Sequence, residues 1–141
     1  MLEVPQLLSE LVAAGRWPAN ADEERAQDLK SRVPTDRIQT FAPEYDRIYL
    51  FALRLRTIRE RVDNGEEFWN WPQAAPSEID FDLVLDIGDF GLGSDAPILL
   101  DYRTNASNPR VIRLVWTTSK TQNHWQVVAP DFPAFVELLG I

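Results

Sequence analysis

A glycine-rich turn runs directly into a hydrophobic strand in the stretch Asp89-Phe90-Gly91-Leu92-Gly93-Ser94-Asp95-Ala96-Pro97-Ile98-Leu99-Leu100-Asp101-Tyr102-Arg103. Gly88, Gly91 and Gly93 predict a turn or bulge, because glycine adopts positive φ angles at no steric cost. Pro97 suits the first residue of a strand, where its missing N–H is tolerated. The aliphatic run behind it predicts a strand, and the stretch therefore indicates a strand entered through a tight turn.

Alternating side chains predict another strand before this turn. From residue 79 to residue 87 the apolar side chains share one face, whereas Asp80, Asp82 and Asp86 share the other. This period of two is typical of a half-buried strand. Two further strands are predicted at Val111–Trp116 and Trp125–Val128. The spacing of these strands indicates an antiparallel meander.

Helices are predicted at both ends of the chain. Apolar residues recur at helical spacing over residues 5–14, and a second helix is expected from Asp22, which we interpret as its N-cap. A short helix is expected at Thr57–Val62. The closing helix is predicted at Asp131–Leu139, where the apolar residues form one buried stripe.

Two segments in the first half of the chain look extended, Arg37–Phe41 and Asp46–Leu55. The second is apolar on both faces, which predicts a central strand covered on both sides. Helices at both ends of an antiparallel block indicate an α+β fold, with about four to six strands and helices packed on the sheet. The 141 residues are expected to form a single domain, residues 1–141.

Four features of the second half occur in a fixed order. They are the turn Ile87-Gly88-Asp89-Phe90-Gly91, the strand end Leu100-Asp101, the strand from Val111 to Trp116, and the helix entered through Ala129-Pro130-Asp131-Phe132. In this order and spacing the chain resembles the SMI1/KNR4 family, also called the SUKH superfamily, over roughly residues 79–141. The resemblance implies an SMI1/KNR4-like fold, a structural hydrogen-bonding role for Asp101, and protein binding without a shared catalytic set. Such families include immunity proteins that neutralise bacterial toxins, as well as scaffolding and regulatory proteins.

The net charge of the chain limits the classes of partner that it can attract. The net charge is −8, and a negative field repels phosphate backbones and anionic lipid surfaces. We therefore expect neither nucleic acid nor a membrane as a partner. A basic protein would be attracted and steered by the same field, although acidity also serves solubility alone.

Other features bear on compartment and cofactors. The chain has no cysteine, which excludes disulfides and thiolate chemistry. The first residues lack the basic region and apolar run of a secretory signal, and no stretch reaches the length of a bilayer-spanning helix. We expect a cytoplasmic protein, and we assign no cofactor, no metal ion and no catalytic residue.

Acidic side chains are the first candidates for contacting a protein partner: Asp80, Asp82, Asp86, Asp89 and Asp95. No Lys or Arg lies between Glu78 and Tyr102. If the first three share the outer face of a strand, they stand about 7 Å apart at each two-residue step and complement a basic groove. The alternatives are a solvated strand face and a strand edge protected against aggregation.

Trp69 and Trp71 are the second candidates for partner binding. Aromatic residues this dense beside Pro72 either plug the edge of the core or anchor an interface, and we expect at least one to be buried. The arginines at 54, 56, 59 and 61 form the only dense basic patch of the sequence. We expect them to be solvated or paired with nearby acids.

These observations lead to one principal hypothesis and two alternatives. The chain is interpreted as a non-enzymatic protein-binding module, most simply an immunity-type protein that occludes a toxin with an acidic surface. One alternative is a small hydrolase with a carboxylate pair, which predicts a pocket and a raised pKa. The other is a ligand-sensing or regulatory scaffold domain with an apolar pocket built from Trp69, Trp71 and Trp116.

Three other kinds of site fit the sequence poorly. The turn from Asp89 to Asp95 offers oxygen ligands for calcium but does not follow the EF-hand order of acidic residues. Its glycines resemble a phosphate-binding loop, but its aspartates would repel phosphate. A catalytic triad would have to use His124, the only histidine, which we expect to face solvent.

Overall fold

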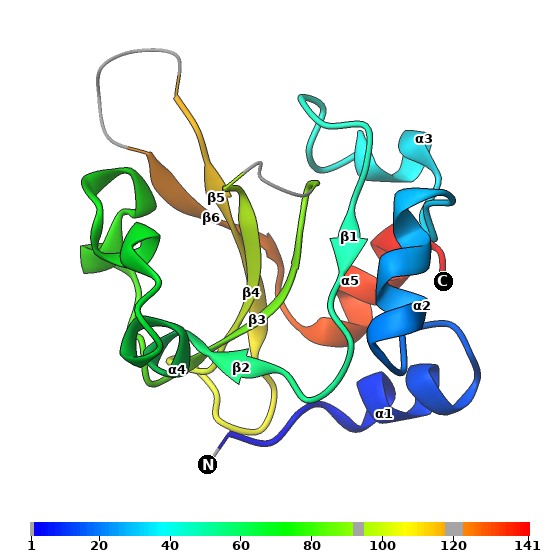
Figure 1. Cartoon of the computed structure of the whole chain (residues 1–141), viewed down its shortest axis with the longest axis horizontal. Coiled ribbons are helices and arrows are strands. Elements are labelled where there is room, and N and C mark those ends of the chain that lie inside the picture. Colours follow the sequence, from blue (N-terminus) through cyan, green and yellow to red (C-terminus); the bar gives the residue numbers. More distant parts are fainter. Residues whose placement is uncertain (1, 92–94, 118–122) are drawn as a thin grey trace.

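The computed structural model describes residues 2–91, 95–117 and 123–141, and an antiparallel sheet lies at its centre (Figure 1). Within the described residues the sheet has six strands in the order β1-β3-β4-β5-β6, and β2 also pairs with β3. The strands are β1 (Tyr49–Leu50), β2 (Arg56–Thr57), β3 (Val84–Asp89), β4 (Pro97–Asp101), β5 (Arg110–Val115) and β6 (His124–Ala129). The expected α+β fold with a mostly antiparallel sheet is confirmed.

Helices cover both faces of this sheet. They are α1 (Gln6–Ala13), α2 (Ala21–Arg25), α3 (Thr35–Ile38), α4 (Ile58–Asp63) and α5 (Phe132–Leu139), with the single 3-10 turns η1 (Ala26–Asp28), η2 (Glu67–Asn70), η3 (Pro72–Ala74) and η4 (Pro76–Glu78). In Figure 1, α1, α2, α3 and α5 lie on one side of the sheet, and α4 lies on the other. We call these the first and the second face.

Two hydrophobic cores result from this arrangement. The first face carries the larger core, in which Trp17 packs edge-on against Phe132 with ring centroids 5.8 Å apart. The core of the second face contains Ile58, Trp69, Ile79, Val84, Leu99 and Ile112. Every residue of β4 is buried, because its side chains alternate between the two cores. The aliphatic run after Pro97 is therefore explained by a central strand that both cores enclose.

The predicted meander and closing helix are confirmed. Successive strands from β3 to β6 pair antiparallel, and Pro97 is the first residue of β4. The Asp131 carboxylate accepts a hydrogen bond from the Ala134 N–H at 2.9 Å and caps α5, and Gly140 ends that helix at φ +72°. Thr57 caps α4 by accepting the Glu60 N–H at 3.1 Å. These ends follow from local side-chain chemistry, which the sequence displays directly.

The first half of the chain departs from three predictions. Arg37–Phe41 is not extended, because α3 begins directly after Pro34 and is followed by a turn. Asp46–Leu55 is not a central strand, since only Tyr49 and Leu50 pair, and they form the edge strand β1 beside β3. Its apolar residues are buried against the first face of the sheet, not between flanking strands. The N-cap of α2 is Asn20, whose side chain accepts the Glu23 N–H at 2.9 Å, and not Asp22.

The predicted glycine bulge lies at Gly88. The pairing of β3 with β4 shifts register between Asp86 and Gly88, which is the signature of a bulge. A Cβ atom on Gly88 would stand 2.6 Å from the Tyr49 carbonyl oxygen, so only glycine lets β1 approach β3 here. Gly91 has φ +144°, whereas Gly93 lies outside the described residues.

Candidate functional site

The predicted acidic stripe does not exist as one strand face. Asp80 and Asp82 lie in a turn before β3, where the Asp80 carboxylate accepts the Asp82 N–H at 3.0 Å. Such a side-chain bond to the backbone competes with sheet pairing, so the strand begins only at Val84. The prediction that Asp80, Asp82 and Asp86 share an outer strand face is therefore wrong.

Asp86 is buried, with 4% of its surface exposed. It lies on the second face beneath α4, where Arg61 Nε stands 3.1 Å from one carboxylate oxygen, and its other oxygen, Oδ1, has no hydrogen-bond partner. Burial raises the pKa of Asp86 to about 8, against the opposing effect of Arg61. Because its side chain is buried, Asp86 cannot contribute to an acidic contact surface.

Asp101 is also buried but keeps its charge. It accepts hydrogen bonds from the Arg103 guanidinium, the Arg103 N–H and Arg110 Nε, at distances of 2.9 to 3.3 Å. Burial alone would raise the pKa of Asp101, but these hydrogen bonds outweigh it and hold the pKa below its usual range. The structural role that the family resemblance implies for Asp101 agrees with this geometry.

The remaining predicted aspartates differ in exposure. Asp89 is half-buried, and its carboxylate accepts the Gly91 N–H at 3.2 Å. Asp82 and Asp95 are exposed, and Asp82 forms an ion pair with Arg59 at 3.0 Å. Asp95 has φ +50°, which turns its backbone so that its carbonyl oxygen accepts the indole N–H of Trp116 at 2.8 Å. Asp80, Asp82 and Asp95 are thus the predicted acids that a partner can reach.

The tryptophans divide as expected. Trp69 is buried in the core of the second face, whereas Trp71 is 47% exposed. Phe68 lies edge-on to both rings, with centroid distances of 5.3 Å to Trp69 and 6.0 Å to Trp71. Trp71 is therefore held by an aromatic neighbour while half of its surface stays in contact with water.

Two further exposed apolar side chains lie on the second face. Trp116 is 40% exposed directly after β5, and Val127 of β6 is 48% exposed. Val127 pairs with Ile112, which belongs to the second core, and alternation along β5 places Trp116 on the same face as Ile112. We call Trp71, Trp116 and Val127 the tryptophan surface. Sequence reasoning missed Val127, since only the strand order shows that β6 is an edge strand.

Hydrogen bonds tie the parts of the tryptophan surface together. Asn123 accepts the Thr117 N–H at 3.0 Å and donates to the Gln73 carbonyl at 2.8 Å. The indole of Trp125 donates to the Ala74 carbonyl at 2.9 Å. The segment that carries Trp71 is therefore hydrogen-bonded to residues at the ends of β5 and β6.

The open edge of β6 is partly capped. The Trp125 N–H donates to a carboxylate oxygen of Glu78, which lies at the end of η4, at 3.0 Å. The bond uses an N–H group that would otherwise face solvent or another strand. At Trp125 the edge of β6 is thus occupied by the side chain of Glu78.

Four observations bear on the metal, catalytic and calcium sites that the sequence analysis considered. Within residues 2–91, 95–117 and 123–141, no group of three or more His, Asp or Glu side chains is arranged to hold a metal ion. His124 is exposed at the start of β6, as expected. Asp86 has the raised pKa that the hydrolase alternative requires, but it lines none of the cavities described below. The proposed calcium turn includes residues 92–94, which lie outside the described residues.

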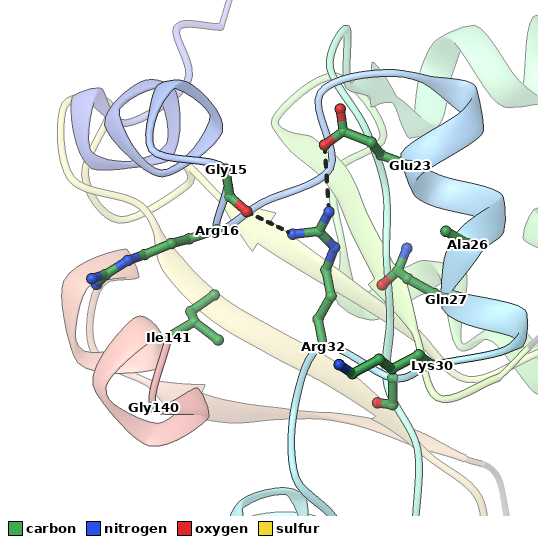
Figure 2. Close-up of a pocket in the computed structure, with 10 residues that line it drawn as sticks. Gly15, Arg16, Glu23, Ala26, Gln27, Lys30, Arg32, Gly140 and Ile141 are labelled. Atoms are coloured by element: carbon green, nitrogen blue, oxygen red, sulfur yellow. Dashed lines mark hydrogen bonds and ion pairs between the residues drawn. The ribbon is translucent and has the colours of Figure 1, made fainter.

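A cavity of about 590 Å³ lies where α1, α2 and the end of α5 meet. Figure 2 shows Arg32 reaching between two partners, the Gly15 carbonyl at 3.1 Å and the Glu23 carboxylate at 3.4 Å. Arg32 thereby joins the end of α1 to α2, so its charge is used within the fold. We interpret this cavity as a structural junction.

A second cavity, of about 760 Å³, is mostly aliphatic. Its lining comprises Leu2, Val4, Leu53, Arg54, Leu55, Thr57, Glu60, Asp82, Leu83 and Leu85, which we call the leucine pocket. Trp69, Trp71 and Trp116 do not line either of these two cavities.

Comparisons with protein-family models, with curated proteins and with solved structures found no match for this chain. Across the part of the chain that the structure describes, no helix combines the length and apolar character needed to cross a membrane. The function is therefore inferred from the chain's own residues.

Proposed function

We propose that this chain is a non-enzymatic protein-binding module that contacts its partner through the tryptophan surface. The observation that carries the proposal is the exposure of Trp71 and Trp116 on the second face, each held by a contact to its own fold. Tryptophan provides a large apolar area and a polar N–H, and it is enriched among the residues that dominate binding energy. Exposed aromatic side chains held by such contacts are what an interface anchor requires.

The charge around this surface favours a basic partner. Acidic side chains at Asp63, Glu67 and Asp80 are exposed on segments that cover or border the second face. Three arginines of the same region are paired within the fold, namely Arg54 with Glu60, Arg59 with Asp82, and Arg61 with Glu66 and Asp86, whereas Arg56 of β2 is exposed and outside these pairs. Because the three paired arginines are neutralised locally, the net charge of −8 dominates the field that a partner meets.

We further propose an immunity-type role in the cytoplasm, in which the chain occludes a basic toxin domain. The resemblance of residues 79–141 to the SMI1/KNR4 family supports this role, and so does the combination of an acidic field with aromatic anchors. The field would speed the encounter, and the tryptophans would then supply buried apolar area. The mechanism is steric and electrostatic occlusion, without chemistry on the partner.

The test is affinity capture of the tagged chain from a lysate of its own organism, at low and at high salt, with mass-spectrometric identification. We expect one stoichiometric basic protein, captured less well at high salt. The variant carrying Trp71→Ser and Trp116→Ser should lose it.

Leu29→Ser is the matched control, because Leu29 is 95% exposed but belongs to the segment after α2 on the first face. Capture by this control should equal that of the parent chain. A partner that binds the double tryptophan variant as well as the parent chain would disprove the tryptophan surface as the interface.

A further inference from the structure

The leucine pocket shares no residue with the tryptophan surface, and its aliphatic lining lies on the first face of the sheet, whereas Glu60 comes from α4 on the second face. Leu85 and the half-buried Leu2, Val4, Leu53 and Leu83 all belong to or pack against the core of the first face. The volume of about 760 Å³ falls within the range of small-molecule sites. The pocket is therefore large enough to accept a ligand in its own right.

Three segments far apart in the sequence build the walls of the pocket. One is the N-terminal segment, which the Tyr102 hydroxyl holds by donating to the Glu3 carbonyl at 2.6 Å. The second runs from Leu53 to Glu60 and includes β2 and the first turn of α4, and the third leads from Asp82 into β3. Each wall is anchored to the sheet, so the hollow is a property of the fold.

The lining is aliphatic, with polar groups limited to a few positions. Leu55 and Leu85 are buried at its base, whereas Leu2, Val4, Leu53 and Leu83 keep part of their surface exposed. Covering this exposed apolar surface would release about 25 cal/mol for each Å² removed from water. No aromatic ring lines the cavity, so flexible hydrocarbon fits it better than a flat ring system.

The charged groups of the lining include one more carboxylate than guanidinium, and each carboxylate also pairs with an arginine. They are two carboxylates, Glu60 and Asp82, and one guanidinium, Arg54, which bonds one Glu60 oxygen at 3.0 Å. Asp82 is exposed and paired with Arg59 from outside the lining. A negatively charged head group would meet these carboxylates and the field of a chain with net charge −8.

We propose that the leucine pocket binds a medium-chain aliphatic amphiphile whose head group carries a positive charge. The hydrocarbon chain lies against the leucines, and the head group lies beside Glu60 and Asp82. This inference does not rest on the proposed protein partner, because the leucine pocket and the tryptophan surface share no residue.

The experiment uses three probes with one hydrocarbon chain, decyltrimethylammonium, decanol and decyl sulfate, each below its micelle concentration. The readout is the NMR spectrum of the whole chain labelled at Leu and Val methyl groups. We expect decyltrimethylammonium to shift the methyl groups of the leucine pocket and to bind most tightly, with decyl sulfate the weakest. Equal or tighter binding of decyl sulfate, or shifts spread over the whole protein, would overturn the proposal.

Variants locate the site. Leu53→Trp fills the cavity and should weaken decyltrimethylammonium binding by about tenfold or more. Val4→Trp fills the cavity from the N-terminal segment and replaces Leu53→Trp in the experiment if that variant does not fold. Leu29→Trp adds the same ring at an exposed position of the first face and should leave binding unchanged. Unchanged binding in a folded cavity-filling variant would contradict the site.

The double variant Glu60→Gln with Asp82→Asn tests the head group. It should reduce the preference for decyltrimethylammonium over decyl sulfate by about two- to fivefold, while decanol binding stays the same. An unchanged preference would overturn the assignment of the head group to these two carboxylates.

Discussion

Asp86 and Asp101 are buried carboxylates on adjacent strands, but their surroundings act on the negative charge in opposite ways. Asp101 accepts hydrogen bonds from two arginines and one backbone N–H, and its pKa is lowered. Asp86 has one ion pair, to Arg61 at 3.1 Å, together with the Gly88 backbone N–H, and its pKa is raised to about 8. The number of donors that reach the oxygens, and not burial alone, decides whether a buried carboxyl keeps its charge.

The neighbours of the two groups explain the difference further. Glu66 shares the Arg61 guanidinium with Asp86, and Asp89 adds a second negative charge nearby. Around Asp101 the adjacent charges are positive, with Arg110 directly across the strand pair. The surroundings of two carboxyl groups on one sheet thus shift their pKa values in opposite directions.

The largest expected effect comes from Asp101→Asn. The substitution leaves Arg103 and Arg110 without the charge they enclose, and breaking such a buried pair should cost about 3 kcal/mol of unfolding free energy. Urea denaturation at pH 7 measures this loss. If the loss stays under about 1 kcal/mol, Asp101 does not hold these strands in the way the geometry indicates.

Asp86→Asn should stabilise the protein at pH 7, by about 1 to 2 kcal/mol. The folded state holds the Asp86 proton up to about pH 8, whereas the unfolded chain releases it near the ordinary value of 3.8. Between these two pH values the unfolded state binds fewer protons, so the stability of the parent chain falls as pH rises. The Asp86→Asn variant has no titrating group at this position, so its stability does not fall for this reason.

Urea denaturation of Asp86→Asn and of the parent chain at several pH values tests whether the stability of the parent chain falls as pH rises. The advantage of the variant should grow from about pH 4 to about pH 8 and then level off. An advantage that is independent of pH, or a variant that is less stable at pH 8 than at pH 4 relative to the parent, would show that Asp86 is charged in the folded state.

Arg61→Met should cost only about 1 kcal/mol. Removing the partner of a charged buried carboxylate typically costs 3–5 kcal/mol, but a protonated Asp86 is not left with a stranded charge. The loss then reflects the contacts of Arg61 with Glu66 and with the Phe51 ring, 5.6 Å from the guanidinium. Thermal unfolding at pH 7 distinguishes a protonated Asp86 from a charged one. A loss of unfolding free energy above about 3 kcal/mol would show that Asp86 carries a negative charge.

The smallest effect is expected from Asp82→Asn. This carboxylate is exposed in its ion pair with Arg59, and exposed pairs are screened by water and salt. Its urea midpoint should match that of the parent chain. The variant therefore serves as the control for Asp101→Asn and Asp86→Asn, and a clear loss would mean that exposed carboxylates also stabilise the fold.

The sequence predicted the second half of the fold well because its signals are local. Alternation, a glycine bulge and the Asp131 cap each act within a few residues, and together they define β3 to β6 and α5. The first half was predicted less well. A four-residue helix such as α3 is too short to show a period, and β1 pairs with β3 across more than thirty residues.

The candidate site was only partly visible in the sequence. The alternation from residue 79 onward suggested a strand through Asp80 and Asp82, but the Asp80 side chain bonds the backbone there instead. The burial of Asp86 depends on α4 covering the second face, which no local pattern shows. The density of aromatic residues did indicate that Trp69 and Trp71 would divide between core and surface.

The carboxylate of Glu78 on the edge of β6 also limits how the protein meets copies of itself. A strand from another molecule that extended the sheet would have to displace Glu78 from the Trp125 N–H and strip water from its charge. Adding strands from other molecules to a sheet edge is the first step toward fibrils. Each molecule that offers its β6 edge carries the same cost of displacing Glu78. One acidic side chain thus opposes the addition of a strand at this point of β6.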